Sequence, residues 1–264
     1  LFRSTLAFKD IALQLLGNLF DHFLENKSQK LIIIGATSGD TGSAAIEAIK
    51  ESKYAKIFIL HPHNRVSEFQ RKQMTTVNTN NVYNLAIRGN FDDCQNIIKR
   101  LFRDNSLNNL KLGSINSINW TRIMTQISYY IYAFYKIKRM TNKKNISFSV
   151  PTGNFGDVYA GYLAKKRFNI PITKLIVATN KNNILDRVFK TGIYKREKVY
   201  QTISPSMDIQ VASNFERLLY DLYQLDSSKV NMLMEKFKNE GKISIDKSAI
   251  MSAREDFISF SVNE

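Results

Sequence analysis

A chain of 264 residues, of which 44% are hydrophobic and 11% aromatic, holds enough apolar material for one large or two modest globular domains. With only four prolines and eleven glycines, it does not fit a collagen-like or low-complexity protein. The formal net charge of +15 comes from scattered Lys and Arg residues. Because no basic stripe with interleaved aromatics occurs, we expect no nucleic-acid partner.

Targeting signals, cysteines and histidines further limit the classes of protein to which the chain can belong. No apolar run approaches the roughly 20 residues of a membrane span, and no signal peptide is recognisable, so we expect no membrane partner. The chain starts at Leu1 without an initiator Met, which predicts a fragment. Cys94 is the single cysteine, which fits a reducing compartment, and we predict a cytoplasmic protein. His61 and His63 lack an accompanying Cys or acidic cluster, so we predict no metal site.

The predicted elements alternate between helices and short buried strands. A helical spacing of apolar residues covers 7–24, and the β-branched run 31–34 predicts a buried strand that ends in a Gly-rich loop. A helix over 44–50 and a strand over 56–60 complete a β-α-β unit. Further along, strands are predicted over 82–87, 147–150 and 174–179, and helices over 91–103, 120–140, 158–166, 215–225 and 228–239. The predicted class is α/β with parallel sheets.

Two loops of unusual composition follow predicted strands, at the carboxyl ends where open parallel sheets bind ligands. The first, 36–42, offers backbone N–H and hydroxyl donors just before a helix. It is either an anion site or an ordinary turn capped by Asp40 or Thr41. The second, 153–157, has two glycines and also precedes a helix, so it is either a phosphate site or a strand-to-helix turn.

A lysine stands among apolar residues at the mouth of the first predicted helix. Desolvation and the positive end of the helix dipole disfavour the charged form of Lys9, which favours an amine nucleophile. The adjacent Asp10 would offset this effect. The alternative is an ordinary solvated surface lysine.

Seven strings, in this order, resemble threonine synthase: TLAFKDIALQLLG (5–17), GATSGDTG (35–42), VSEFQRKQMTT (66–76), NLAIRGNFDDC (84–94), NSINWTR (116–122), PTGNFGD (151–157) and SPSMDIQ (204–210). Threonine synthases are pyridoxal 5′-phosphate (PLP) enzymes of fold type II, in the tryptophan synthase beta-like family. The resemblance covers almost the whole chain. It implies an α/β fold of two domains with mainly parallel sheets flanked by helices: a small mobile domain at 31–145, and a large PLP-binding domain at 1–30 plus 146–264, incomplete in this chain.

The resemblance also implies roles for individual residues. Lys9 would bind PLP covalently and act as the catalytic residue, and Asp40 would contact the cofactor. The cofactor phosphate would be held by Gly153, Asn154, Phe155, Gly156 and Asp157. The substrate carboxylate and phosphate would be contacted by Thr37, Ser38, Thr41, Ser117, Asn119 and Arg122. Arg122 suits phosphate because a guanidinium can grip two oxygens at once.

The implied reaction converts O-phospho-L-homoserine and water to L-threonine and phosphate, in a monomer or a homodimer. A phospho-lyase of the same family and an inactive truncated remnant are the alternatives. One departure supports the remnant: the family's His-Gly-Pro before the lysine motif is replaced by Arg3-Ser4, one residue shorter. Gly-Pro sets a tight backbone conformation that Arg-Ser need not reproduce, and the change could displace Lys9.

Overall fold

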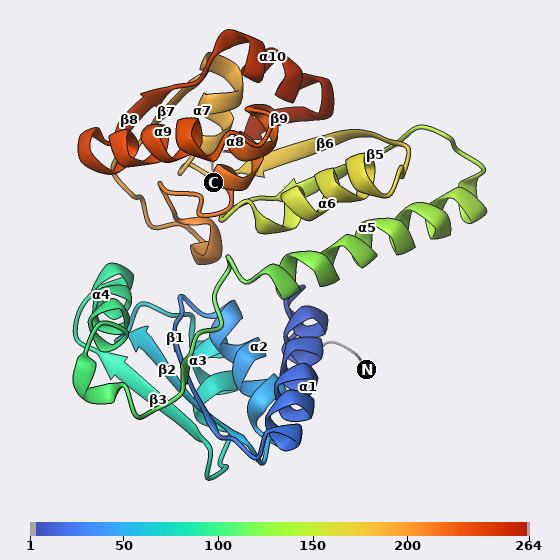
Figure 1. Ribbon diagram of the computed structural model, residues 1–264. Helices are drawn as coiled ribbons and strands as arrows, with labels where there is room; N and C mark the ends of the chain where they lie inside the picture. Colours follow the sequence, from blue (N-terminus) through green and yellow to red (C-terminus); the bar gives the residue numbers. More distant parts are fainter. Residues whose placement is uncertain (1–3, 263–264) are drawn as a thin grey trace. The chain divides into compact units, whose positions relative to one another are not determined.

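The computed structural model describes residues 4–262, apart from the side chain of Asp92. The chain forms two compact units, Leu1–Thr125 and Gln126–Glu264, each with its own parallel sheet (Figure 1). The division falls within helix α5 (Trp120–Thr141). The domain division expected from the resemblance, with 1–30 joined to 146–264, stays a prediction. Within residues 4–262, no helix combines the length and apolar character that crossing a membrane requires.

The first unit contains a four-stranded parallel sheet in the order β3-β2-β1-β4. Its strands are β1 (Leu31–Ala36), β2 (Ala55–Pro62), β3 (Val82–Ile87) and β4 (Leu112–Gly113). Ile33 pairs with Ile57, which in turn pairs with Val82, so apolar residues form a continuous row across three strands. Because all the strands are parallel, their carboxyl ends share one edge of the sheet.

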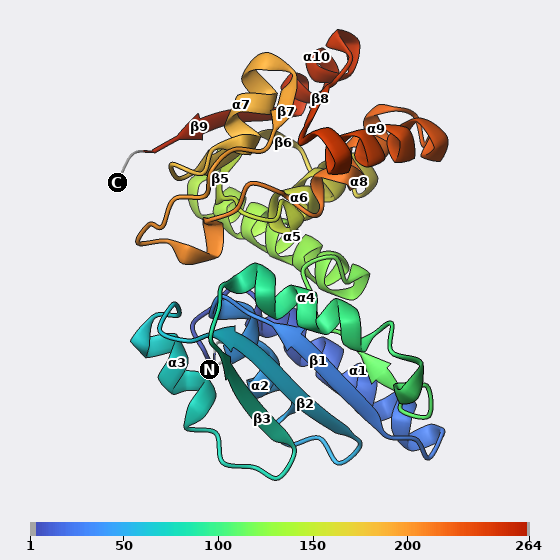
Figure 2. The ribbon, with the colours of Figure 1, turned by 90° about the vertical axis from the view of Figure 1, so that its left-hand side faces the viewer.

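Alternating side chains of β1 and β2 fill two separate cores, one on each face of this sheet. Figure 2 shows helices on both faces of the sheet. Ile33 and Ile57 point to one face, where they pack with residues of α1 (Asp10–Asn26), α2 (Asp40–Ile49) and α3 (Glu68–Thr75). On the opposite face, Ile34 and Leu60 pack against Cys94 of α4 (Phe91–Leu101). Both faces are covered, which explains why these strands read as continuous apolar runs rather than as alternating ones.

Helices α1 and α2 lie in very close contact. A Cβ added to Gly17 of α1 would lie 2.5 Å from the backbone oxygen of Ala48 in α2, so only glycine permits this approach. Lys9, which caps α1, also contacts Asp40, the first residue of α2. The two contacts lie eight residues apart on each helix, so α1 and α2 run side by side in the same direction.

The second unit contains the parallel sheet β5-β6-β9, formed by β5 (Ile146–Pro151), β6 (Ile172–Thr179) and β9 (Phe257–Ser261). A separate antiparallel pair joins β7 (Ile193–Lys195) to β8 (Lys242–Ser244). The helices are α6 (Gly156–Arg167), α7 (Ile184–Thr191), α8 (Phe215–Leu222), α9 (Ser227–Glu240) and α10 (Lys247–Asp256). Aromatic rings dominate the core of this unit: Phe155, Phe189, Tyr194, Phe215 and Phe257 are all buried.

All predicted helices and strands occur in the structure, with ends that shift by a few residues. Several elements of the structure had no counterpart in the prediction: α3, α7, α10, β4, β7, β8 and β9.

Candidate active site

Lys9 lies at the start of α1, and its Nζ atom is 2.8 Å from Oδ2 of Asp40. The two side chains are only 12% and 23% exposed. The Lys9 ammonium also lies 4.4 Å from the centroid of the Phe8 ring, a cation–π contact. Lys9 is therefore a largely buried lysine with a charged partner, and the alternative of a solvated surface lysine is wrong.

Asp10 does not act on Lys9 in the way that their adjacency suggested. Its buried carboxylate accepts hydrogen bonds from the backbone N–H of Thr5, at 2.9 Å, and from the Thr5 hydroxyl. These bonds close the turn before α1, in which Leu6 adopts a left-handed φ of 61°. The anionic partner of Lys9 is thus Asp40, which sequence adjacency could not reveal.

The loop over 36–42 is organised by Thr37. Its buried Oγ1 accepts hydrogen bonds from the backbone N–H groups of Gly39, at 2.9 Å, and of Gly42, at 2.8 Å. Gly39 is the N-cap of α2 and has a φ of 142°, a conformation that favours glycine. Neither Asp40 nor Thr41 occupies the N-cap position, so Thr37 supplies the stabilisation that had been expected from them. Asp40 is thereby left to face Lys9.

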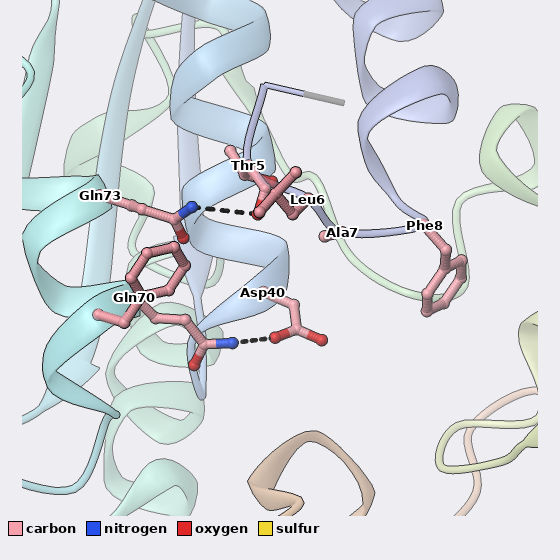
Figure 3. Close-up of a pocket in the computed structure, with 8 residues that line it drawn as sticks. Thr5, Leu6, Ala7, Phe8, Asp40, Gln70 and Gln73 are labelled. Carbon is pink, nitrogen blue, oxygen red and sulfur yellow. Dashed lines mark hydrogen bonds between the residues drawn. The ribbon is translucent and has the colours of Figure 1, made fainter. Parts of the chain in front are cut away.

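A pocket of about 310 Å³ opens beside Asp40 (Figure 3). It is lined by Thr5, Leu6, Ala7, Phe8, Asp40, Phe69, Gln70 and Gln73. The side chain of Gln70 donates a hydrogen bond to Asp40, and Gln73 donates one to the backbone oxygen of Thr5 at 3.0 Å. Neither glutamine was among the residues predicted from the sequence to form the site. Their spacing of three residues within the string at 66–76, which places them on one side of a helix, was the available signal.

The three residues predicted to hold the substrate phosphate lie just before α5 and in its first turn. Asn119 Oδ1 accepts a hydrogen bond from the Thr121 backbone N–H at 3.0 Å, so this side chain helps to start the helix. Arg122 lies in the first turn of α5 and is only 3% exposed. Ser117 lies in the preceding loop and is partly buried. A guanidinium so well shielded from water is suited to binding an anion.

In the second unit, the loop over 153–157 connects β5 to α6. A Cβ on Gly153 would lie 2.8 Å from the backbone oxygen of Ser206, so this position has no room for a side chain. Phe155 caps α6 with a left-handed φ of 67°. Its ring packs in the aromatic core, with its centroid 5.5 Å from that of Phe215 and 5.7 Å from that of Phe257. Phe155 can therefore contribute to the loop only through its backbone.

Asn154 and Asp157 are both held by neighbours in the second unit. The backbone oxygen of Asn154 accepts hydrogen bonds from Asn214 N and Nδ2, at 3.0 and 3.1 Å. The Tyr130 hydroxyl donates to Asp157 Oδ1 and lies 3.0 Å from it. Burial, together with the Asp157 charge, raises the pKa of Tyr130 well above its usual value, so this hydroxyl keeps its proton. The loop is thus rigidly anchored from both sides.

Each unit, taken by itself, holds groups that fit one part of a cofactor that carries an aldehyde and a phosphate. The loop over 153–157 precedes a helix of 12 residues, whose first turn leaves backbone N–H groups without partners inside the helix. The absence of a side chain at Gly153 lets the loop pack directly against the backbone of Ser206, which fixes its position before the helix. Lys9 supplies a buried amine. Among residues 4–262, no group of three or more His, Cys, Asp or Glu residues is arranged to hold a metal ion.

The first unit thus holds a buried lysine in an ion pair, and the second holds an anchored glycine loop at a helix N-terminus, a kind of position at which α/β proteins bind anions. Comparison with known proteins identifies the family to which the chain belongs. Residues 1–246 match the family described as pyridoxal-phosphate dependent enzyme, and the chain belongs to this family. The predicted fold-type-II class is thereby confirmed, and PLP is the cofactor of the family.

Relatives among known proteins confirm the resemblance to threonine synthase. The chain is 50% identical to threonine synthase from Pseudomonas aeruginosa over 98% of its own length and 55% of that protein. It is 47% identical to the Saccharomyces cerevisiae enzyme over 97% of its length and 53% of the relative. The solved structure of PLP-bound threonine synthase from Brucella melitensis superimposes with a TM-score of 0.90 at 47% identity, covering 98% of this chain and 55% of that one. The chain spans about half the length of the relatives it matches.

Proposed function

We propose that this protein carries out threonine synthase chemistry, converting O-phospho-L-homoserine and water to L-threonine and phosphate with PLP. The observation that carries the proposal is the ion pair between Lys9 and Asp40, in a chain that is 50% identical to a threonine synthase. A buried amine with a carboxylate beside it suits a lysine that must both bind an aldehyde and move protons.

Within the proposal, each group of residues has a separate task. Lys9 binds the cofactor covalently through Nζ, and Asp40 contacts the cofactor. Backbone N–H groups in the loop over 153–157 hold the cofactor phosphate, helped by the dipole of α6. Thr37, Ser38 and Thr41 belong to the loop that binds the substrate carboxylate, with Thr37 acting by keeping the loop in shape. Ser117, Asn119 and Arg122 hold the substrate phosphate.

The chemical role of Lys9 is proton transfer. PLP, when bound, supplies an electron sink that stabilises negative charge developing at the carbon atoms of the substrate. Once its amine is free, Lys9 removes the proton from Cα of the substrate, and a second proton is lost from Cβ before the phosphate leaves. Protons then return to Cγ and Cα. Asp40, whose Oδ2 lies 2.8 Å from Nζ, stabilises the ammonium that forms each time the amine takes up a proton. Arg122 neutralises the phosphate that leaves from Cγ, and water adds at Cβ.

The phospho-lyase alternative is not favoured, because the relatives of 43–50% identity are named threonine synthases. We further propose that the protein acts in the cytoplasm as a monomer or a homodimer. A single cysteine, the buried Cys94, supports a reducing compartment because it cannot form a disulfide within the chain. Light scattering of the purified chain distinguishes the two oligomeric states.

Cofactor attachment is the direct test of this function. The purified chain is mixed with PLP and reduced with borohydride, and the labelled peptide is located by mass spectrometry. We expect the label on Lys9 and its loss in Lys9→Ala. A chain labelled at Lys9 is then assayed with O-phospho-L-homoserine for release of threonine and phosphate. An unlabelled Lys9 peptide would contradict the proposal and support the inactive remnant, and phosphate release without threonine would support the phospho-lyase.

A further inference from the structure

The Asp40 carboxylate is held by donors on both of its oxygens. Lys9 Nζ donates to Oδ2 at 2.8 Å, and Gln70 Nε2 from helix α3 donates to Oδ1. Figure 3 shows the side chains of Gln70 and Asp40 pointing toward one another at the edge of the pocket. A carboxylate with a donor on each oxygen cannot rotate about its side-chain bond without losing a charge-assisted hydrogen bond. We propose that Gln70 is a positioning residue that holds the Asp40 carboxylate against Lys9.

The amide of Gln70 is itself oriented. Ser67 Oγ donates to Gln70 Oε1 at 3.1 Å, and the same hydroxyl accepts a hydrogen bond from the Gln70 backbone N–H at 3.3 Å. Ser67 is the N-cap of α3, so one residue both starts this helix and orients the amide. Because an amide has an acceptor end and a donor end, engaging Oε1 leaves Nε2 directed at Asp40. A continuous series of hydrogen bonds thus connects Ser67 to Gln70 and Gln70 to Asp40, which also accepts from Lys9.

The loop before α2 leaves room for this arrangement. A Cβ on Gly39 would collide with Oε1 of Gln70, so the amide fits only over a glycine. The Ser43 hydroxyl donates to the Gln70 backbone oxygen at 3.4 Å, which further ties α3 to α2. Gly39, with its φ of 142°, therefore serves two purposes: it turns the backbone into α2 and it makes space for Gln70.

The consequence concerns the protonation of Lys9. An ammonium in a fixed ion pair holds its proton more firmly than one whose partner is mobile, and only the neutral amine attacks an aldehyde. A catalytic role for Gln70 rests on the proposed function. The effect of Gln70 on the reactivity of Lys9 in the cofactor-free chain does not depend on that function. The positioning role and the proposed function can therefore be refuted separately.

The test measures the acylation rate of Lys9 in the cofactor-free chain, using a limiting amine-reactive reagent and mass spectrometry. Lys72, on the same helix as Gln70 and with a side chain 62% exposed, is the internal reference. Gln70→Met keeps the side-chain length but removes both hydrogen bonds, and we expect Lys9 to react roughly three- to tenfold faster. Gln70→Glu adds negative charge beside Asp40, so we expect Lys9 to react more slowly. The opposite signs separate positioning from a general loosening of α3.

Two further variants complete the experiment. Gln95→Met makes the same substitution on α4 and should leave the Lys9 rate unchanged. Ser67→Ala leaves the amide in place but removes its orienting hydroxyl, and we expect a smaller acceleration, which keeps the test decisive if Gln70→Met does not fold. The proposal is overturned if Lys9 reacts at the wild-type rate in both Gln70→Met and Ser67→Ala, or if Gln70→Met and Gln70→Glu change the rate in the same direction.

Discussion

Replacing Gly17 by alanine sets two effects of opposite sign against each other. In a helix interior, glycine to alanine gains about 1 kcal/mol of stability from helix propensity. The new Cβ would however lie 2.5 Å from the backbone oxygen of Ala48, so α1 and α2 must move apart. Overpacking of this kind costs about 1–3 kcal/mol, and the cost lies in the upper part of that range when the neighbour is backbone rather than a flexible side chain. We therefore expect Gly17→Ala to lower the free energy of unfolding by about 1–2 kcal/mol.

Thermal unfolding followed by circular dichroism measures this difference. The expected loss corresponds to a fall of roughly 2–8 °C in the transition of the first unit. Asn18→Ala is the matched control, because Asn18 is the next residue of the same helix and is exposed. It gains propensity without a clash, so we expect a rise of about 0.5 kcal/mol. A Gly17→Ala protein as stable as the wild type would refute the claim that close contact limits this pair of helices.

Three more predictions concern other parts of the chain. Gly153→Ala places a Cβ 2.8 Å from Ser206 O, so the loop that is proposed to hold the cofactor phosphate must shift. Fluorescence titration should then show a PLP dissociation constant raised by about tenfold or more. An unchanged PLP affinity would count against the phosphate site. Burial lowers the pKa of His61 below its unfolded value of about 6.5, so the unfolded chain binds more protons and stability falls as the pH decreases below about 6.5. Urea unfolding should show this loss in the wild type but not in His61→Gln. Burial raises the pKa of the Cys94 thiol, so a thiol reagent should modify it far more slowly in the native chain than in urea, and equal rates would contradict its burial.

Much of the fold could be predicted because the strands are apolar runs and the longer helices have regular spacing. Strand β3 has the predicted bounds, Val82–Ile87. Helix α3 was missed because its eight residues contain only two large apolar side chains, Phe69 and Met74, and only Met74 is buried. No apolar stripe exists in so short a polar helix. Strand β9 was missed because its apolar residues do not mark its buried face: Phe257 and Ser259 are buried, whereas Ile258 and Phe260 are exposed.

The candidate site was predictable in its residues but not in its pairings. Lys9 and Asp40 were both singled out, yet they are 31 positions apart, and no spacing rule connects them. Sequence proximity instead suggested Asp10, which is used to close the turn at Thr5. The contact of Gln70 with Asp40 could not be predicted for the same reason, since the two residues lie on different helices. Tertiary contacts of this kind are set by how helices pack, which local patterns do not encode.

The parallel course of α1 and α2 places a constraint on how this gene can change in length. Lys9 meets Asp40 at one point, and Gly17 meets Ala48 at a second point eight residues further along each helix. Deleting one residue between these points in either helix would shift its register by about 1.5 Å and turn it by about 100°. The glycine contact and the ion pair could then no longer form together. Insertions and deletions should therefore be excluded from the first two turns of both helices, whereas the connection between Asn26 and Leu31 is free to vary in length across related genes.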